Sequence, residues 1–451
     1  MRRPHANRTG VLAILITMVL WIDAAQSVAD GLRVGAAAVE LQADDSMIIG
    51  GSIHGGTVQG QEGQLRAVAV VLEKPPFGKV AIVACDVLMM RRDLLDPVTE
   101  RIKSAAGIPT ANILINATHT HHAPSTCTVH GYERDMIFCK RVQDAVVEAV
   151  TRADAKLADG ASRFFFRLGE ESSFGQNSRL LLEDGTVYWV GPRDDVVRPT
   201  GPFDPELPVL AFRDPAGAMQ AMIFNHSTHT IGVRKGGRSP SVYGLAAQEL
   251  ESELGGTVCF LEGASGSTHN LNVPAGEAIL RVKNAVRDAL GKARPLPVKR
   301  LAAIKRPFTF TVRKFDESAE DAAVSAYCKK RIADGADGVI EVFRKQRRAL
   351  APHRGEPRTT WLQVLLIGDV AVVGVPAEFF TLLGQEIKRR SPFRYTYVAE
   401  LANDWIGYVP DRKAYELGGY QTWTGLHSYV AQGTGEDMVD AVVDMLNEAA
   451  K

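Results

Sequence analysis

The chain has 451 residues, and its 52 lysine and arginine residues are balanced by 52 aspartate and glutamate residues. This zero formal charge argues against a nucleic-acid-binding surface, which requires a basic excess. Hydrophobic residues make up 45% of the chain and 41 residues are glycine, as expected for a globular protein with an ordinary core and many tight turns. The length allows two or three domains. Because no linker, repeat or low-complexity segment divides the chain, we predict one domain over residues 30–451.

The first 29 residues are predicted to be a secretory signal peptide. Arg2, Arg3 and Arg8 precede the apolar run 11–22, and residues 27–29 (Ser-Val-Ala) have the spacing of a signal-peptidase site. The run is short for a membrane span, and an uncleaved N-terminal anchor is the alternative. No other long apolar segment occurs in the sequence. We therefore expect a secreted or periplasmic protein with no transmembrane segment after cleavage, and with peripheral membrane contact at most.

Export permits disulfide bonds, and the sequence has five cysteines. An odd number leaves at least one free thiol. Cys127 and Cys139 flank a loop and are candidates for a disulfide, whereas Cys85 and Cys259 lie in apolar, strand-like runs and are predicted to be buried thiols. No Cys-x-x-Cys spacing occurs, so a thiolate zinc site is not expected.

Strands and helices alternate along the rest of the chain, which favours an α/β fold. Two pairs of strands joined by tight turns interrupt this alternation and must be antiparallel. We predict a single α/β domain with mixed β-sheets flanked by helices and a metal site at the strand ends. The predicted strands are 64–72, 79–85, 112–116, the hairpins 179–188 and 209–224, 257–261, the hairpin 361–375, and 395–401; the predicted helices are 89–106, 137–153, 243–254, 278–293, a helical segment over 314–348, 378–389 and 436–449.

Histidines gather where the predicted strand 112–116 ends. His119, His121 and His122 lie in the segment 118–124 that follows it. Side chains two residues apart on a strand point to the same face, so His119 and His121 can converge on one point. Imidazole is the commonest protein ligand for zinc. The pattern predicts a metal site, with a polar loop that caps the strand as the alternative.

Three other strand ends carry similar chemistry. His226 lies in the segment 225–229, Glu378 follows a buried strand at a predicted helix start, and Tyr408 ends the segment 403–408. Ligand sites in α/β sheets gather at the carboxyl ends of strands, and histidine, carboxylate and phenol ligands suit zinc. Each residue also has a structural interpretation: His226 as a core histidine, Glu378 as a partner of the helix dipole, and Tyr408 as a packed aromatic.

These motifs, in this order, resemble the neutral (alkaline, non-lysosomal) ceramidase family, in particular its N-terminal catalytic domain. The resemblance covers essentially the whole mature chain. Its motifs are Ala-Thr-His-Thr-His at 117–121, His-Ser-Thr at 226–228, the glycine-rich loop 263–270, Val-Pro-Ala-Glu-Phe at 375–379, and the segment 403–408 followed by Tyr415 and Tyr420.

The resemblance implies that the protein hydrolyses the N-acyl amide of ceramide at a single zinc ion. Carried over residue by residue, it implies that His119, His226, Glu378 and Tyr408 are the zinc ligands. It implies that the substrate contacts are His121, Tyr420 and Arg179. Tyr408, His121 or Arg179 would then stabilise the oxyanion through hydrogen bonds.

The chain departs from the family pattern in the glycine-rich loop. The family's Gly-Asp-Val-Ser-Pro reads Gly-Ser-Thr-His-Asn at 266–270, so His269 replaces a functional serine. We assign His269 the hypothetical role of general acid to the leaving group. The chain also ends near the point where ceramidases begin an immunoglobulin-like C-terminal domain, which we expect to be absent. The alternatives are a zinc hydrolase acting on a non-lipid ester, amide or sugar-derived compound, and a non-catalytic ligand-binding homologue.

Overall fold

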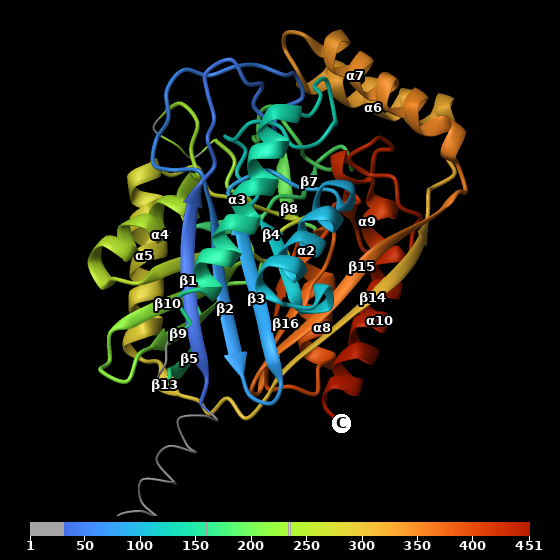
Figure 1. Cartoon of the computed structure of the whole chain (residues 1–451). Helices are drawn as coiled ribbons and strands as arrows, with labels where there is room; N and C mark the ends of the chain where they lie inside the picture. The colour runs from blue at the N-terminus through green and yellow to red at the C-terminus, as the bar shows by residue number, and fades with distance from the viewer. Residues whose placement is uncertain (1–30, 158–160, 233, 235) are drawn as a thin grey trace, which may run out of the picture.

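The computed structural model describes residues 31–157, 161–232, 234 and 236–451, and the predicted signal peptide lies outside the described residues. Three larger sheets, each antiparallel except for one parallel pair at its edge, are packed together with helices on their outer faces (Figure 1). The predicted α/β class with mixed sheets and flanking helices is therefore confirmed.

The first sheet has the order β1-β2-β3-β4 and lies against α2 and α3 (Figure 1). Strands β1 to β3 are antiparallel, and β4 joins β3 in parallel after the crossover through α2. Alternate residues of β2 enter two different cores, so both faces of the sheet are buried and its strands read as continuous apolar runs. The bounds are β1 Arg33–Glu40, β2 Arg66–Lys74, β3 Gly78–Cys85, α2 Arg92–Ala106, β4 Ile113–Ala117 and α3 Met136–Asp154.

The second sheet has the order β11-β10-β9-β5-β13, and α4 and α5 cover its outer face. Strands β10 and β11 are parallel because α4 connects them, whereas β9 and β10 form the predicted hairpin. The bounds are β5 Arg163–Glu170, β9 Glu206–Arg213, β10 Met219–His226, α4 Ser241–Leu254, β11 Thr257–Glu262, α5 Ala275–Gly291 and β13 Arg294–Pro295.

The third sheet has the order β14-β15-β16-β18 and packs against α8 and α10. The helical hairpin α6–α7 connects β14 to β15 and extends beyond the ends of these two long strands (Figure 1). Apolar side chains from all three sheets meet in one core between them, among them Val70, Leu210 and Val372. The bounds are β14 Leu301–Thr311, α6 Glu317–Arg331, α7 Ala336–Leu350, β15 Pro357–Ile367, β16 Val370–Gly374, α8 Thr381–Arg390, β18 Tyr395–Ala399 and α10 Thr434–Ala449.

Short strand pairs at the ends of these sheets position the polar segments. Glu378 lies in one of them, directly opposite Tyr408 in a parallel pair, and the following helix begins only at Thr381. The predicted helix start at Glu378 is therefore wrong, because this residue forms backbone hydrogen bonds to a strand first. The pairs are β6 Gly175–Asn177 with β12 Thr268–Asn270, β7 Leu180–Leu182 with β8 Val196–Pro199, and β17 Glu378–Phe379 with β19 Tyr408–Val409; α9 spans Arg412–Leu417.

All five cysteines are free and buried, so the predicted Cys127–Cys139 disulfide is not formed. Each of these two thiols instead faces a backbone carbonyl: Cys127 that of Met89 at 3.6 Å, and Cys139 that of Thr126 at 3.8 Å. Within the part of the chain that the structure describes, no helix combines the length and the apolar character needed to cross a membrane.

Candidate metal centre

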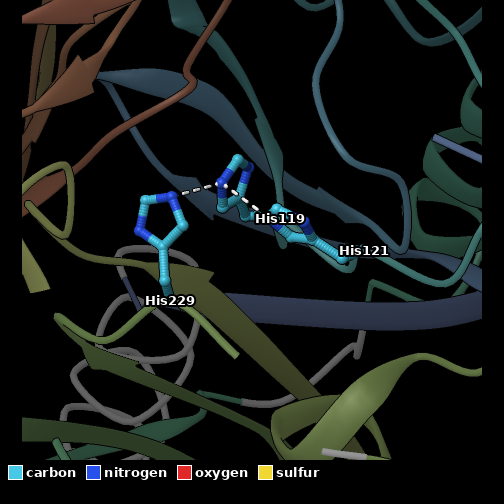
Figure 2. A group of neighbouring side chains, drawn as sticks. All are labelled: His119, His121 and His229. Atoms are coloured by element: carbon cyan, nitrogen blue, oxygen red, sulfur yellow. Dashed lines mark hydrogen bonds between the residues drawn. The ribbon is translucent and has the colours of Figure 1, made fainter. Parts of the chain in front are cut away.

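Three histidines from two distant segments converge on one point. His119 and His121 follow β4, and His229 follows β10. Nε2 of His119 lies 2.7 Å from Nε2 of His229 and 3.3 Å from Nε2 of His121 (Figure 2). The predicted convergence of His119 and His121 is thus present in the structure, together with a third imidazole.

The other ring nitrogen of each histidine fixes its tautomer. Nδ1 of His119 faces the carbonyl oxygen of Leu88 at 2.8 Å, Nδ1 of His121 that of Gly51 at 2.9 Å, and Nδ1 of His229 that of Ser265 at 2.8 Å. A carbonyl only accepts, so each Nδ1 carries the proton and each neutral ring has its lone pair on Nε2. No proton is then available between the three Nε2 atoms. Converging lone pairs with second-nitrogen hydrogen bonds are the arrangement that holds a metal ion.

Burial keeps these rings neutral. It lowers the pKa of all three, that of His229 to about 3, and the neighbouring imidazoles lower the pKa values of His119 and His229 further. Neutral imidazole is the form that binds a metal. The cluster therefore needs no deprotonation at neutral pH before it can act as a ligand set.

Glu378 adds a carboxylate to the histidines. Its Oε2 lies 3.3 Å from Nε2 of His229 and 3.7 Å from Nε2 of His119. Its Oε1 accepts a hydrogen bond of 3.0 Å from Nε1 of Trp405, which holds the carboxyl group in place. Three imidazoles and a carboxylate form a donor set that suits zinc.

Tyr408 lies beside this group because the β17–β19 pair places it opposite Glu378. Its ring is nearly parallel to that of His229, with 6.3 Å between centroids and 9° between planes. Burial, together with the charge and hydrogen bond of Glu378, raises the pKa of Tyr408 well above its usual range. The hydroxyl group is therefore protonated at neutral pH.

The structure does not bring His226 to the cluster. As the last residue of β10 it is buried, with Nδ1 at 2.6 Å from the hydroxyl oxygen of Tyr243 and Nε2 at 3.0 Å from the carbonyl oxygen of Glu171. Both ring nitrogens are thus used within the protein. His229, three residues further on, where the chain has left the strand, lies at the cluster in place of His226.

A polar group that the sequence does not predict lies behind His229. The hydroxyl of Ser265 lies 3.0 Å from Nδ1 of His229 and donates a 2.6 Å hydrogen bond to Oε1 of Glu400. Oε2 of Glu400 accepts from the backbone N–H groups of Ser265 and Phe379 at 3.0 and 2.7 Å. The carboxyl group of Glu400 thus fixes Ser265, and Ser265 in turn orients His229.

The backbone at the cluster is strained in a way typical of functional sites. His119 has φ 60°, in the left-handed region that few non-glycine residues adopt. Gly51 has φ 110°, and a Cβ atom there would lie 2.6 Å from Nδ1 of His121. The sequence gives no signal for this contact, because Gly51 and His121 are remote in the chain.

Gly51→Ala is expected to weaken metal binding at least about tenfold, because the new methyl group displaces His121 and its hydrogen bond to the residue 51 carbonyl. A competition titration with a chromophoric zinc chelator measures the affinity. Gly56→Ala is the control, since a Cβ atom there meets nothing within 4 Å. Equal affinities of the two variants would contradict the role of this contact.

His269 and Tyr420 lie at the more exposed edge of the group. His269 forms an isolated bridge with His229, and the two rings are 5.1 Å apart. Burial and the neighbouring histidines lower the pKa of His269 well below its usual value. The ring of Tyr420 meets that of Tyr408 edge-on at 5.7 Å. His121, His269 and Tyr420 are partly buried whereas His119 and His229 are buried, so this edge is the more exposed side of the group.

Arg179 points into the protein and supports a loop. Its side chain is buried, and its guanidinium group donates to Oε1 of Gln421 at 2.9 Å and to the carbonyl oxygens of Ala414 and Gly418 at 3.2 and 2.6 Å. Burial lowers its pKa to about 10, so it is charged at neutral pH. The loop that it holds carries Tyr420, which gives Arg179 an indirect connection to the site.

Buried neutral histidines make the metal-free protein sensitive to acid. Histidines of the unfolded chain take up protons as the pH falls through about 6.5. In the folded protein the pKa values of eight histidines are lowered, those of His122 and His427 to about 3. Four buried carboxyl groups with raised pKa values act in the opposite direction but are fewer. The histidines are His119, His121, His122, His130, His226, His229, His269 and His427, and the carboxyl groups are Asp86, Glu262, Glu400 and Asp404.

Below about pH 6.5 the eight unfolded histidines bind more protons than the four folded carboxyl groups retain, so the free energy of unfolding of the metal-free protein should fall as the pH is lowered from about 6.5 to 5. Each proton of difference is worth about 1.4 kcal/mol per pH unit. Urea unfolding at several pH values, with reversibility checked by returning to pH 7, measures the effect. A stability that is constant or that rises toward pH 5 would contradict it.

Comparison with solved structures gives the class of this fold, that of the ceramidases. The crystal structure of neutral ceramidase from Pseudomonas aeruginosa superposes with a TM-score of 0.70, at 19% sequence identity, over 92% of this chain and 74% of that one. A ceramidase complexed with C2 superposes with a TM-score of 0.71, again at 19% identity, over 92% and 75% of the two chains.

The sequence itself is similar to one particular protein of this class. The curated neutral ceramidase of Pseudomonas aeruginosa is 22% identical over 406 residues, which cover 74% of this chain and 59% of that protein. The chain thus matches less than two thirds of the length of this relative. No protein-family model matches the chain. The resemblance to the neutral ceramidases that the motifs predicted is confirmed.

Proposed function

We propose that this protein is a zinc-dependent hydrolase that cleaves the N-acyl amide of a ceramide-like lipid. The observation that carries the proposal is the convergence of three unprotonated Nε2 atoms and one carboxylate oxygen, Oε2 of Glu378, at the strand ends of a ceramidase-type fold. The similarity to neutral ceramidase supports the reaction class.

In this proposal His119, His229 and Glu378 hold the metal, and His121 either completes the set or contacts the substrate. Zinc bound there would supply an activated water at neutral pH and polarise an acyl carbonyl. The water oxygen would form a bond to the acyl carbon, the C–N bond would break, and a proton from the same water would pass to the leaving nitrogen, which releases a fatty acid and an amine. Tyr408 keeps its proton, and once Glu378 holds the metal the Tyr408 hydroxyl can turn from this carboxylate and donate to the oxygen that gains charge.

In this scheme His269 is not the general acid that was predicted from the sequence. Its lowered pKa leaves the ring neutral, so it can exchange a hydrogen bond with the leaving amine but has no extra proton to give as an imidazolium acid. It replaces a serine that the family pattern contains. This replacement favours a second candidate function: the same hydrolytic site acting on a non-lipid ester or amide. Export and contact with a membrane surface complete the proposal, since a ceramide-like substrate resides in membranes.

A metal-loaded substrate panel tests the proposal. Protein stripped with a chelator is reloaded with zinc, its metal content is measured, and short- and long-chain ceramides are compared with a simple acyl ester and an N-acyl amino acid. We expect about one zinc per chain and release of fatty acid from ceramide only after reloading. Cleavage of the ester alone would replace the first candidate by the second, and absence of stoichiometric zinc would overturn both.

His121→Ala decides between the two roles of this residue. If His121 is a ligand, the variant should lose zinc affinity together with turnover. If it contacts substrate, the variant should keep one zinc per chain and show a raised KM. The zinc content and KM of the purified variant are the two measurements.

A further inference from the structure

A hydrogen-bonded chain leads from helix α7 to the more exposed edge of the candidate site, through residues that the proposed function does not use. Its last member is Tyr420, whose ring lies between Trp189 and His427. The centroid of the Tyr420 ring lies 4.8 Å from that of Trp189 and 4.8 Å from that of His427, and the angles between the ring planes are 4° and 18°. The hydroxyl oxygen of Tyr420 lies 3.1 Å from Nε2 of His130. The ring is therefore held on both faces and at its polar end.

The direction of the chain is set at Gln346, a buried residue of α7. The backbone N–H of Leu426 donates to one amide atom of Gln346 at 3.0 Å, so this atom must be the oxygen, Oε1. The amide nitrogen of Gln346 then faces Nδ1 of His130 at 3.2 Å. A neighbouring backbone donor thus fixes which way the amide is turned.

The amide in turn fixes the tautomer of His130. An NH₂ group can only donate, so Nδ1 of His130 accepts and its ring proton is on Nε2. Burial lowers the pKa of His130 well below its usual value, which keeps the ring singly protonated at neutral pH. Nε2 therefore donates to the hydroxyl oxygen of Tyr420.

Tyr420 consequently uses its oxygen as an acceptor toward His130 and keeps its own proton for another partner. Among the described residues the hydroxyl of Tyr420 makes no other hydrogen bond to a side chain or backbone group. Burial is the main cause that raises the pKa of Tyr420 well above its usual range, and the charge of Glu378 raises it further, so this proton is retained. The ring also meets Tyr408, which borders the histidine cluster.

We propose that Gln346 and His130 are positioning residues that make Tyr420 an obligatory hydrogen-bond donor to the substrate bound at the histidine cluster. The reactive geometry then depends on α7, a helix of the projecting hairpin. His130 has φ 55°, a strained backbone that is held because the ring is fixed at both nitrogens. The identity of the substrate in this inference rests on the proposed function. The tautomer of His130 is independent of the proposed function.

The tautomer is measured by ¹⁵N NMR of the histidine rings, with His130→Gln used to assign the signals of residue 130. We expect Nε2 of His130 to show the shift of a protonated nitrogen and Nδ1 that of an unprotonated one. The opposite pattern would overturn the proposal. The measurement needs no substrate, so it separates a failure of the relay from a failure of the proposed hydrolase activity.

The functional part is a double-mutant cycle between Gln346→Met and Tyr420→Phe, with short-chain ceramide as substrate. Tyr420→Phe should lower kcat/KM about 10²-fold, as expected for one lost oxyanion donor. Gln346→Met should lower it about tenfold, and should have no further effect in the Tyr420→Phe background if it acts only through Tyr420. Effects that multiply in the double variant would overturn the relay. Lys345→Met, on the exposed side of α7, is the matched control and should retain the wild-type kcat/KM.

Discussion

Alanine in place of His229 is expected to reduce zinc affinity more than about 100-fold and to abolish turnover, whereas alanine in place of His226 should leave one zinc per chain. Nε2 of His229 is 2.7 Å from that of His119 and faces Oε2 of Glu378. Both nitrogens of His226 instead bond to groups of the protein. Zinc content after dialysis against a weak chelator, together with fatty-acid release, measures the difference.

The His226→Ala variant is the matched control because it removes an equally buried imidazole from the same segment. It should be destabilised by about 1–3 kcal/mol, since the Tyr243 hydroxyl and the Glu171 carbonyl each lose a hydrogen-bond partner. Urea unfolding measures this cost. Loss of zinc from a folded His226→Ala protein, with zinc retained by His229→Ala, would contradict the assignment.

Which of these two histidines faces the cluster cannot be predicted from the sequence. The sequence places both beyond the same apolar run, and the rule that sites gather at strand ends correctly points to this segment. Which imidazole faces the cluster depends on where β10 stops and how the chain turns after it. His226 is still paired in the sheet, opposite Glu262, whereas His229 is beyond the sheet and bridges His269. A single sequence carries no signal for that turn.

The groups that fix the ligands are harder still to find from sequence. The tautomers of His119 and His121 depend on the carbonyl oxygens of Leu88 and Gly51, and every residue has a carbonyl. Glu400 orients Ser265 from 135 residues further along the chain. Such contacts are defined only by the tertiary fold. The apolar runs, by contrast, predicted most strands and helices because burial on one or both faces imposes a periodic pattern.

The edge strand β14 shows the limit of that periodic signal. Its middle carries Lys305, Arg306 and Pro307, which interrupt the apolar pattern of the sequence. Pairing with β15 along all eleven residues nevertheless makes it a strand. Pro307 is tolerated because β14 has a neighbour on only one side. Here the partner strand, and not the local composition, determines the structure.

Methionine in place of Arg179 is expected to lower the free energy of unfolding by about 3 kcal/mol or more, because three buried acceptors lose their donor. These acceptors are Oε1 of Gln421 and the carbonyl oxygens of Ala414 and Gly418. The loop that contains them carries Tyr420. Turnover should therefore fall as well, as an indirect result of a displaced Tyr420 hydroxyl.

The same variant tests whether Arg179 supports the loop or contacts the substrate. The family resemblance implies a substrate contact. A supporting role predicts a lower midpoint of urea unfolding and a lower kcat/KM. It also predicts that the double variant of Arg179→Met with Tyr420→Phe has the same kcat/KM as Tyr420→Phe alone. A substrate contact predicts an unchanged midpoint and a raised KM that adds to the effect of Tyr420→Phe. Arg198→Met is the control, since Arg198 is exposed and, among the described residues, its side chain bonds only to the carbonyl of its neighbour Pro199; the stability of this variant should stay within about 0.5 kcal/mol of the wild type. An unchanged unfolding midpoint for Arg179→Met would contradict the supporting role, because a buried guanidinium group with three acceptors cannot be removed without cost.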